Sequence, residues 1–151
     1  MAKPNQHEPP EAGSFETLIG RSAVFTKSIT ASDLAAFGQL TGDDHPNHTN
    51  DSYALAQGFG GCIAQGSFLV GMIAGASCRL LEAIKRPAVS YGYDKVRFLK
   101  PVRAGDQVTV KYTIREFDAA KNNVAAEAQL FNQHGQLVAV GINILHFSCD
   151  Y

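Results

Sequence analysis

The residues best suited to chemistry lie together in the polar segment at positions 42–48, which reads GDDHPNH. Four residues separate Asp43 from His48, and Pro46 stiffens the backbone between them. A carboxylate and an imidazole on such a rigid segment could converge on one water molecule and move its protons. The sequence does not divide the work between the two groups, because a close pair of this kind can titrate as a unit.

The same segment has two plainer interpretations. Asp43 directly follows Gly42, and aspartate is common in such turns, so its carboxylate could simply stabilise a turn. His45 and His48, together with Asp43 and Asp44, could also bind zinc or iron. A three-residue histidine spacing in a loop is not a recognised zinc arrangement, and no further ligand cluster is evident. We therefore predict no metal site.

The elements that position this segment can be predicted from periodicity and capping residues. Residues 22–29 have the composition of a strand, and residues 30–42 combine a capping pattern with one apolar stripe, which predicts a short helix. Pro46 disfavours helical geometry at the residue before it, so residues 43–48 are predicted to form an irregular loop. A second short helix is predicted over residues 51–57.

A long apolar helix is predicted from about Gln65 to Ile84. The 20 residues from Phe59 to Cys78 carry no charge, a length that would also fit a membrane span. Glycines interrupt this stretch, and Arg79 and Glu82 follow directly on the same helix. A helix buried inside a soluble protein therefore explains it better than a membrane span.

The second half of the chain changes to the two-residue period of strands. Strands are predicted over residues 89–98, 107–115, 124–131 and 137–147. Their links are short, which implies antiparallel pairing between consecutive strands. The fold class is therefore α+β, with one strand, then helices including a buried central one, then four strands that curl around it. Residues 15–151 are predicted to form this single domain, and residues 1–14 a disordered tail.

Composition excludes several classes of function. A chain of 151 residues suits one domain, and 13 basic against 14 acidic side chains, without a basic run, argue against nucleic-acid binding. Cys62, Cys78 and Cys149 are an odd number and lie far apart, so neither a disulfide framework nor a cysteine zinc site is encoded. The first residues lack the apolar stretch of a targeting signal. We expect a cytoplasmic protein.

Three segments carry a resemblance to a known family. Residues 37–54, FGQLTGDDHPNHTNDSYA, resemble the signature of the MaoC-like, (R)-specific enoyl-CoA hydratases: Gly-Asp, a polar or aromatic residue, Asn-Pro, an aliphatic residue and His. Residues 63–66, IAQG, stand where that family usually has a His-Gly that opens its central helix. Residues 98–106, FLKPVRAGD, are similar to the strand and turn that follow. The resemblance runs from about Arg21 to Phe147.

The resemblance implies the hot-dog fold, a curled antiparallel sheet wrapped around a long central helix, usually dimeric and acting on coenzyme A thioesters. It implies a hydro-lyase that reversibly hydrates a trans-2-enoyl-CoA to the (R)-3-hydroxyacyl-CoA, with Asp43 and His48 as the catalytic pair. No metal or redox cofactor is expected. Coenzyme A is part of the substrate and is not counted as a cofactor. Gly66 could offer its backbone amide to the thioester oxygen, helped by the helix dipole.

The sequence also departs from the family pattern. His45 replaces the usual asparagine, Asn47 an aliphatic residue, and Gln65 the histidine before Gly66. We take these polar residues as candidate substrate-binding groups, which would suit a substrate with its own polar or carboxylate group. An acyl-CoA thioesterase and a non-catalytic acyl-CoA binding module on the same fold are the alternatives. A homodimer is expected, because a curled sheet leaves edge strands that need cover.

Overall fold

The computed structural model describes residues 15–147, so the predicted tail over residues 1–14 lies outside the described part of the chain, as does Cys149. The elements follow the predicted order closely. They are η1 (Phe15–Leu18), β1 (Ser22–Ser28), α1 (Ala31–Thr41), α2 (Pro46–Thr49), α3 (Asp51–Ala56), α4 (Gly66–Ile84), β2 (Val89–Phe98), β3 (Gln107–Asp118), β4 (Asn123–Phe131) and β5 (Leu137–His146).

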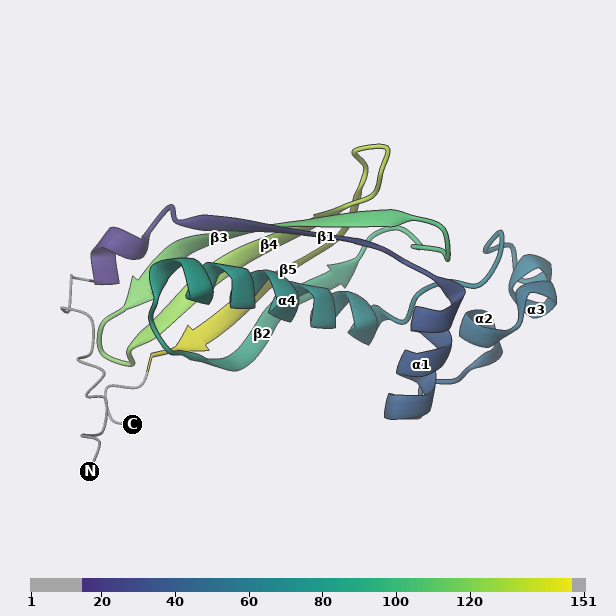
Figure 1. The fold of residues 1–151 in the computed structure, drawn as a ribbon, viewed down its shortest axis with the longest axis horizontal. Coiled ribbons are helices and arrows are strands. Elements are labelled where there is room, and N and C mark those ends of the chain that lie inside the picture. Colours follow the sequence, from purple (N-terminus) through teal and green to yellow (C-terminus); the bar gives the residue numbers. More distant parts are fainter. Residues whose placement is uncertain (1–14, 148–151) are drawn as a thin grey trace, which may run out of the picture.

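The five strands form one antiparallel sheet in the order β1-β3-β4-β5-β2, with α4 against one face (Figure 1). Alternate residues of the central strands point toward α4 and are fully buried, whereas their neighbours face the other side. In β3 the buried set is Val108, Val110, Tyr112 and Ile114. The predicted α+β arrangement of a sheet around a long helix is confirmed.

One predicted strand pairing is wrong. Short links implied that each strand pairs with the next, and this holds for β3 with β4 and for β4 with β5. However, β2 pairs with β5 at one edge of the sheet, and β3 pairs with β1. The link from β2 to β3 does not form a hairpin. It runs alongside the segment that precedes α4, and the Ala64 N–H of that segment donates to the Val102 carbonyl at 2.7 Å.

Helix α4 packs on the sheet through a stripe of apolar side chains. Its buried residues include Leu69, Met72, Ile73, Ala76 and Leu80, and it contacts β1 and β3. Its 19 residues and mean hydropathy of 1.5 would also satisfy the length and composition of a membrane span. The packing against the sheet explains the apolar stripe without one, since the core helix of a soluble protein meets the same criteria.

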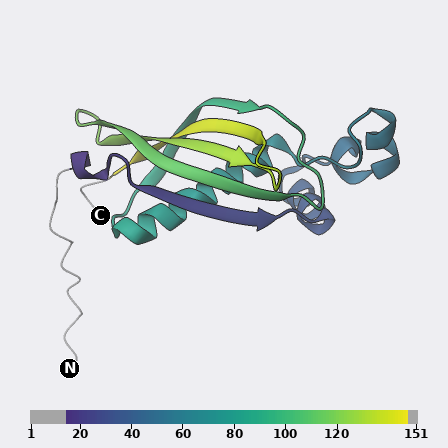
Figure 2. The same cartoon turned by 90° about the horizontal axis from the view of Figure 1, so that it is seen from above.

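The short helices α1, α2 and α3 lie beyond the end of the sheet where α4 begins, and both views show them outside the sheet (Figures 1 and 2). Thr30 and Asp33 form the predicted capping box, and Gly42 ends α1 with a φ of 78°. The predicted irregular loop is partly wrong, because residues 46–49 form the helical turn α2. His45 is non-helical as expected, but proline is favoured at the first position of a helix, so Pro46 begins one.

Candidate active site

The imidazole of His48 is held in one orientation by the backbone. Its Nδ1 lies 2.7 Å from the carbonyl oxygen of Ile63. A carbonyl oxygen can only accept, so Nδ1 carries a proton, and in the neutral form of the ring Nε2 is the acceptor. The side chain is only 14% exposed, and the Ile63 N–H returns a hydrogen bond to the Asn47 carbonyl. The histidine ring and the backbone of the residue before it are therefore both fixed to the segment that leads into α4.

Asp43 lies beside this acceptor nitrogen. Its Oδ1 is 3.7 Å from His48 Nε2, and the carboxylate is 43% exposed. Hydrogen bonds of about 2.8 Å let one water reach two acceptors that are up to about 5.6 Å apart. The structure therefore brings the predicted pair within shared reach of a single water molecule, although the catalytic roles of the two residues remain a prediction.

A hollow of about 370 Å³ opens next to His48 and the start of α4. Its walls are mostly apolar, and its polar side chains are those of His48 and Lys100. The lining includes His48, Phe59, Ile63, Gly66, Leu69, Phe98 and Leu99. A second hollow touches His48 from another side and is lined by Thr49, Asp51 and Cys62 among others.

Gly66 is the first residue of α4, where backbone N–H groups have no intrahelical acceptor. A side chain often satisfies such groups, but the N-cap residue Gln65 makes no cap bond to them. The Phe68 N–H donates to the Gln65 carbonyl, whereas the N–H groups of Gly66 and Ser67 donate in no described hydrogen bond and lie at the positive end of the helix dipole. A Cβ on Gly66 would lie 2.5 Å from the Phe98 ring, so the close approach of that ring requires glycine here.

Of the three polar residues that depart from the family pattern, two have side chains that hydrogen-bond to nearby backbone. His45 caps α2, since its Nδ1 accepts from the Asn47 N–H at 3.3 Å. Gln65 is fully buried, and its amide donates to the carbonyls of Leu34 and Asp43. The Oδ1 of Asn47 is buried and has no hydrogen-bond partner among the described residues. None of the three lines the apolar hollow, so their predicted role in substrate binding remains a prediction.

Sequence reasoning missed the link between Asp51 and Cys62. The Cys62 N–H donates to Asp51 Oδ1 at 2.8 Å and holds the pKa of Asp51 below its ordinary value. Burial, followed by hydrogen bonding and the charge of Asp51, raises the pKa of the Cys62 thiol. The thiol therefore stays protonated and is a poor nucleophile, although it lies in a hollow that His48 also lines.

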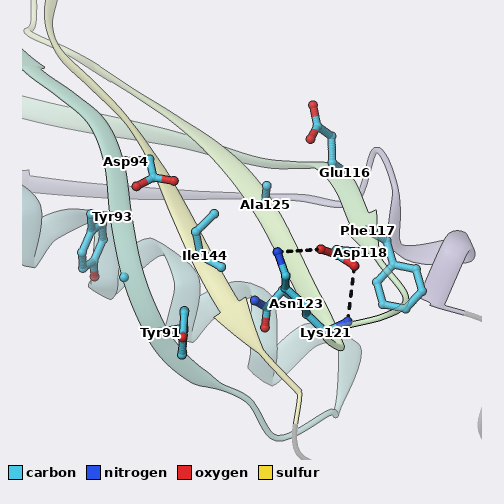
Figure 3. Close-up of a pocket in the computed structure, with 11 residues that line it drawn as sticks. Tyr91, Tyr93, Asp94, Glu116, Phe117, Asp118, Lys121, Asn123, Ala125 and Ile144 are labelled. Atoms are coloured by element: carbon cyan, nitrogen blue, oxygen red, sulfur yellow. Dashed lines mark hydrogen bonds and ion pairs between the residues drawn. The ribbon is translucent and has the colours of Figure 1, made fainter.

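A larger hollow, of about 600 Å³, lies at the other end of the sheet (Figure 3). Ala125 and Ile144 lie in its floor, and they alternate with buried residues, so it opens on the face away from α4. Tyr91, Asp94 and Glu116 stand around it, and Lys121 pairs with Asp118. It shares no lining residue with the hollows at His48.

No group of three or more His, Cys, Asp or Glu side chains within residues 15–147 is arranged to hold a metal ion. The carboxylate and imidazole of Asp43 and His48 are only two donors, whereas protein zinc sites use three or four. The arrangement is better suited to holding and deprotonating a water molecule beside an apolar ligand.

Comparison with known proteins decides the family. The model of the MaoC-like domain matches residues 14–133. The chain belongs to the MaoC-like dehydratase family. It is 35% identical over 103 residues to the 3-hydroxybutyryl-CoA dehydratase of Methylorubrum extorquens, a match that covers 68% of this chain and 64% of that protein. It is 36% identical over 95 residues to the (R)-specific enoyl-CoA hydratase of Rhodospirillum rubrum, covering 63% and 64%.

A solved structure of an (R)-hydratase from A. caviae involved in PHA biosynthesis superposes with a TM-score of 0.76 at 24% identity, covering 86% of this chain and 96% of that one. The hot-dog fold is thereby confirmed. The chain spans about 64% of the length of the two curated relatives named above. The MaoC-like family includes hydratases and dehydratases, and the apolar hollow beside His48 is the candidate ligand site of this chain.

Proposed function

We propose that this MaoC-like protein reversibly hydrates a trans-2-enoyl-CoA to the (R)-3-hydroxyacyl-CoA, without a metal or redox cofactor. The observation that carries the proposal is the 2.7 Å contact of His48 Nδ1 with the Ile63 carbonyl, which turns Nε2 toward the Asp43 carboxylate at 3.7 Å. Two acceptors this close suit a water molecule that donates one hydrogen to each. The similarity to the 3-hydroxybutyryl-CoA dehydratase and to the (R)-specific enoyl-CoA hydratase supports the reaction, and the second relative supports the (R) configuration.

The reaction balances with these groups alone. The water oxygen forms a bond to the β-carbon while its proton passes to the Asp43–His48 pair, and the double-bond electrons move toward the thioester oxygen. The N–H groups of Gly66 and Ser67 at the start of α4 stabilise the negative charge that develops there. The pair then gives the proton to the α-carbon and returns to its starting state. Because one pair handles both steps, water and proton add to the same face of the double bond.

The lining of the hollow favours a plain acyl chain over a charged one. Phe59, Ile63, Leu69 and Phe98 supply apolar walls, and the volume of about 370 Å³ is near the lower end of ligand pockets, which run from roughly 300 to 1,000 Å³. We propose a short or medium apolar acyl chain. Lys100 is exposed in this lining, where its ammonium could meet the phosphates of coenzyme A.

We also propose that the protein is a homodimer. Within residues 15–147, strand β2 pairs only with β5, so its other edge offers backbone groups that no described strand pairs. Three of its apolar side chains are exposed, namely Val89 by 47%, Tyr91 by 73% and Phe98 by 52%. A second copy that pairs along β2 would cover both the edge and these side chains. Sedimentation at low concentration is expected to give twice the monomer mass, and a monomer would contradict this proposal.

The test of function is to follow enoyl absorbance and free thiol together while the protein acts on crotonyl-CoA. We expect the absorbance to fall without thiol release. Thiol release would instead indicate a thioesterase, and thermal stabilisation without turnover would indicate a binding module. A branched dicarboxylic enoyl-CoA serves as the comparison substrate. Faster turnover of this comparison substrate than of crotonyl-CoA would contradict the proposed apolar acyl chain, but it would not contradict the proposed hydration reaction.

A further inference from the structure

Gln65 connects the two halves of the candidate active site. Its backbone begins α4 as the N-cap residue, next to the N–H groups that would bind the thioester oxygen. Its side chain turns away from those groups and is fully buried. The amide nitrogen Nε2 donates to the Asp43 carbonyl at 3.1 Å and to the Leu34 carbonyl in α1 at 3.0 Å. One side chain thus joins the loop of Asp43 to both helices.

The orientation of this amide is set by its partners. Both nearby groups are backbone carbonyls, which only accept, so the nitrogen must face them. The oxygen Oε1 is consequently left buried with no hydrogen-bond partner among the described residues. A buried acceptor without a partner is unfavourable, but an apolar side chain of similar size would leave the Leu34 and Asp43 carbonyls without this donor. The contact that Gln65 supplies is thus the one with the backbone of Asp43 and of α1.

Gly38 provides independent support for this contact. It lies inside α1, where glycine is a poor helix former. A Cβ built on Gly38 would stand 3.2 Å from the Asp43 carbonyl oxygen and 3.5 Å from Gln65 Nε2. A side chain at this position would push against the same carbonyl that Gln65 holds. The missing side chain of Gly38 makes room for the Asp43 loop to lie against α1.

We propose that Gln65 is a positioning residue, which, with the space left by Gly38, fixes Asp43 relative to His48 and the first N–H groups of α4. The inference rests on the proposed hydration, because positioning matters only if Asp43 acts on a bound substrate. Gln65 does not line the apolar hollow, so it acts through Asp43 and not on the acyl chain. A displacement of about 1 Å in such a group can lower a rate by up to roughly a hundredfold.

The test is a double-mutant cycle in the full-length protein. We expect Gln65→Leu to lower kcat for crotonyl-CoA by roughly tenfold to a hundredfold with little change in KM. In the Asp43→Asn background, measured at high enzyme concentration, the same change should lower kcat by less than about twofold, because the group that it positions is already inactive. Equal losses in both backgrounds, or a loss that falls mainly on KM, would overturn the proposal.

Two further variants keep the test decisive. Asn143→Leu is the matched control, since Asn143 is also a fully buried amide, but it bridges β5 to Ser90 and Gly92 away from the site. It should lower stability, leave kcat unchanged and show no coupling to Asp43→Asn. Gly38→Ala retains Gln65 and adds a better helix former, so it covers the case in which Gln65→Leu does not fold. It should also lower kcat.

Hydrogen exchange of residues 43–48 gives a readout that needs no turnover. We expect faster exchange there in Gln65→Leu and Gly38→Ala, and no change in Asn143→Leu. If the wild type hydrates no enoyl-CoA, the proposed function fails, but faster exchange would still show that Gln65 holds the loop. Unchanged exchange in both site variants would overturn the role of Gln65 even in an active hydratase.

Discussion

The sheet with α4 and the end of the molecule that carries Asp43 and His48 are held together by different contacts. Every second side chain is fully buried from Val108 to Ile114 in β3 and from Val124 to Leu130 in β4, on the face that α4 covers. By contrast, α2 has no buried residue and α3 has one, Ala54. Single hydrogen bonds to the backbone hold this end, such as His48 to Ile63 and Arg103 Nε to the Phe59 carbonyl. Substitutions in the sheet should therefore change stability, and substitutions at the helical end should change activity.

The largest effect is expected at the pair itself. Asp43→Asn and His48→Gln should each lower kcat for crotonyl-CoA by roughly a thousandfold, because each replaces one of the two groups that can take a proton from the water by an amide that cannot. Asp44→Asn is the matched control, since this exposed neighbour does not contact His48 in any described interaction. Steady-state kinetics measures all three. A large loss in Asp44→Asn would favour the metal interpretation of this segment.

The next effect concerns the start of α4. Gly66→Ala should lower kcat by roughly tenfold or more, because the added Cβ would meet the Phe98 ring at 2.5 Å and shift the first N–H groups of the helix. Gly71→Ala, on the same helix, has no atom within 4 Å of the added Cβ. It should keep full activity and raise stability by up to about 1 kcal/mol. Similar kinetics for the two variants would contradict the role of Gly66.

A polar contact inside the sheet should behave in the opposite way. Tyr112 and Asn143 are both fully buried, and the Tyr112 hydroxyl donates to Asn143 Oδ1 at 2.7 Å. Burial raises the pKa of Tyr112, so the hydroxyl remains a donor. Asn143→Leu leaves that donor unpaired and should cost about 1–3 kcal/mol in urea unfolding without lowering kcat. A comparable loss of kcat would show that the two regions are not independent.

The smallest effect is expected at the capping box of α1. Hydrogen bonds from Lys27 and then Thr30 hold the pKa of Asp33 below its ordinary value of 3.8. A lowered pKa in the folded state means that the stabilisation is present above about pH 4 and is lost as the pH falls through the lowered value. Asp33→Ala should cost about 1 kcal/mol at pH 7, and less as the medium becomes acidic. A pH-independent difference in urea unfolding would contradict this.

Patterns along one segment were enough to predict most of the fold. The alternation in residues 107–115 and the apolar stripe around Leu69 and Ile73 reflect local periods, and the corresponding β3 and α4 are confirmed. The pairing of β2 with β5 depends on where the link after Phe98 runs, which no local pattern specifies. Proline disfavours helical geometry at the residue before it and is itself favoured as the first residue of a helix. Both preferences are met here, since His45 is non-helical and Pro46 begins α2.

The candidate site was predictable only in part. Asp43, His48 and Gly66 belong to a recognisable motif, and the structure brings them to one end of α4. The polarity of Gln65 is visible in the sequence and suggests a substrate-binding residue. Its burial and its contacts with two carbonyls depend on distant segments, which no local pattern specifies. The glycine at position 38, inside a predicted helix, was the one local signal that the chain approaches closely there.

The most direct test is hydration of crotonyl-CoA in D₂O, with the product analysed by NMR and by its configuration. A single pair that activates water and returns the proton predicts (R)-3-hydroxybutyryl-CoA with one deuterium at the α-carbon, on the same face as the hydroxyl. Asp43→Asn should form almost none of it. Addition to opposite faces, an (S)-alcohol, or release of free coenzyme A in place of the alcohol would contradict the proposed mechanism.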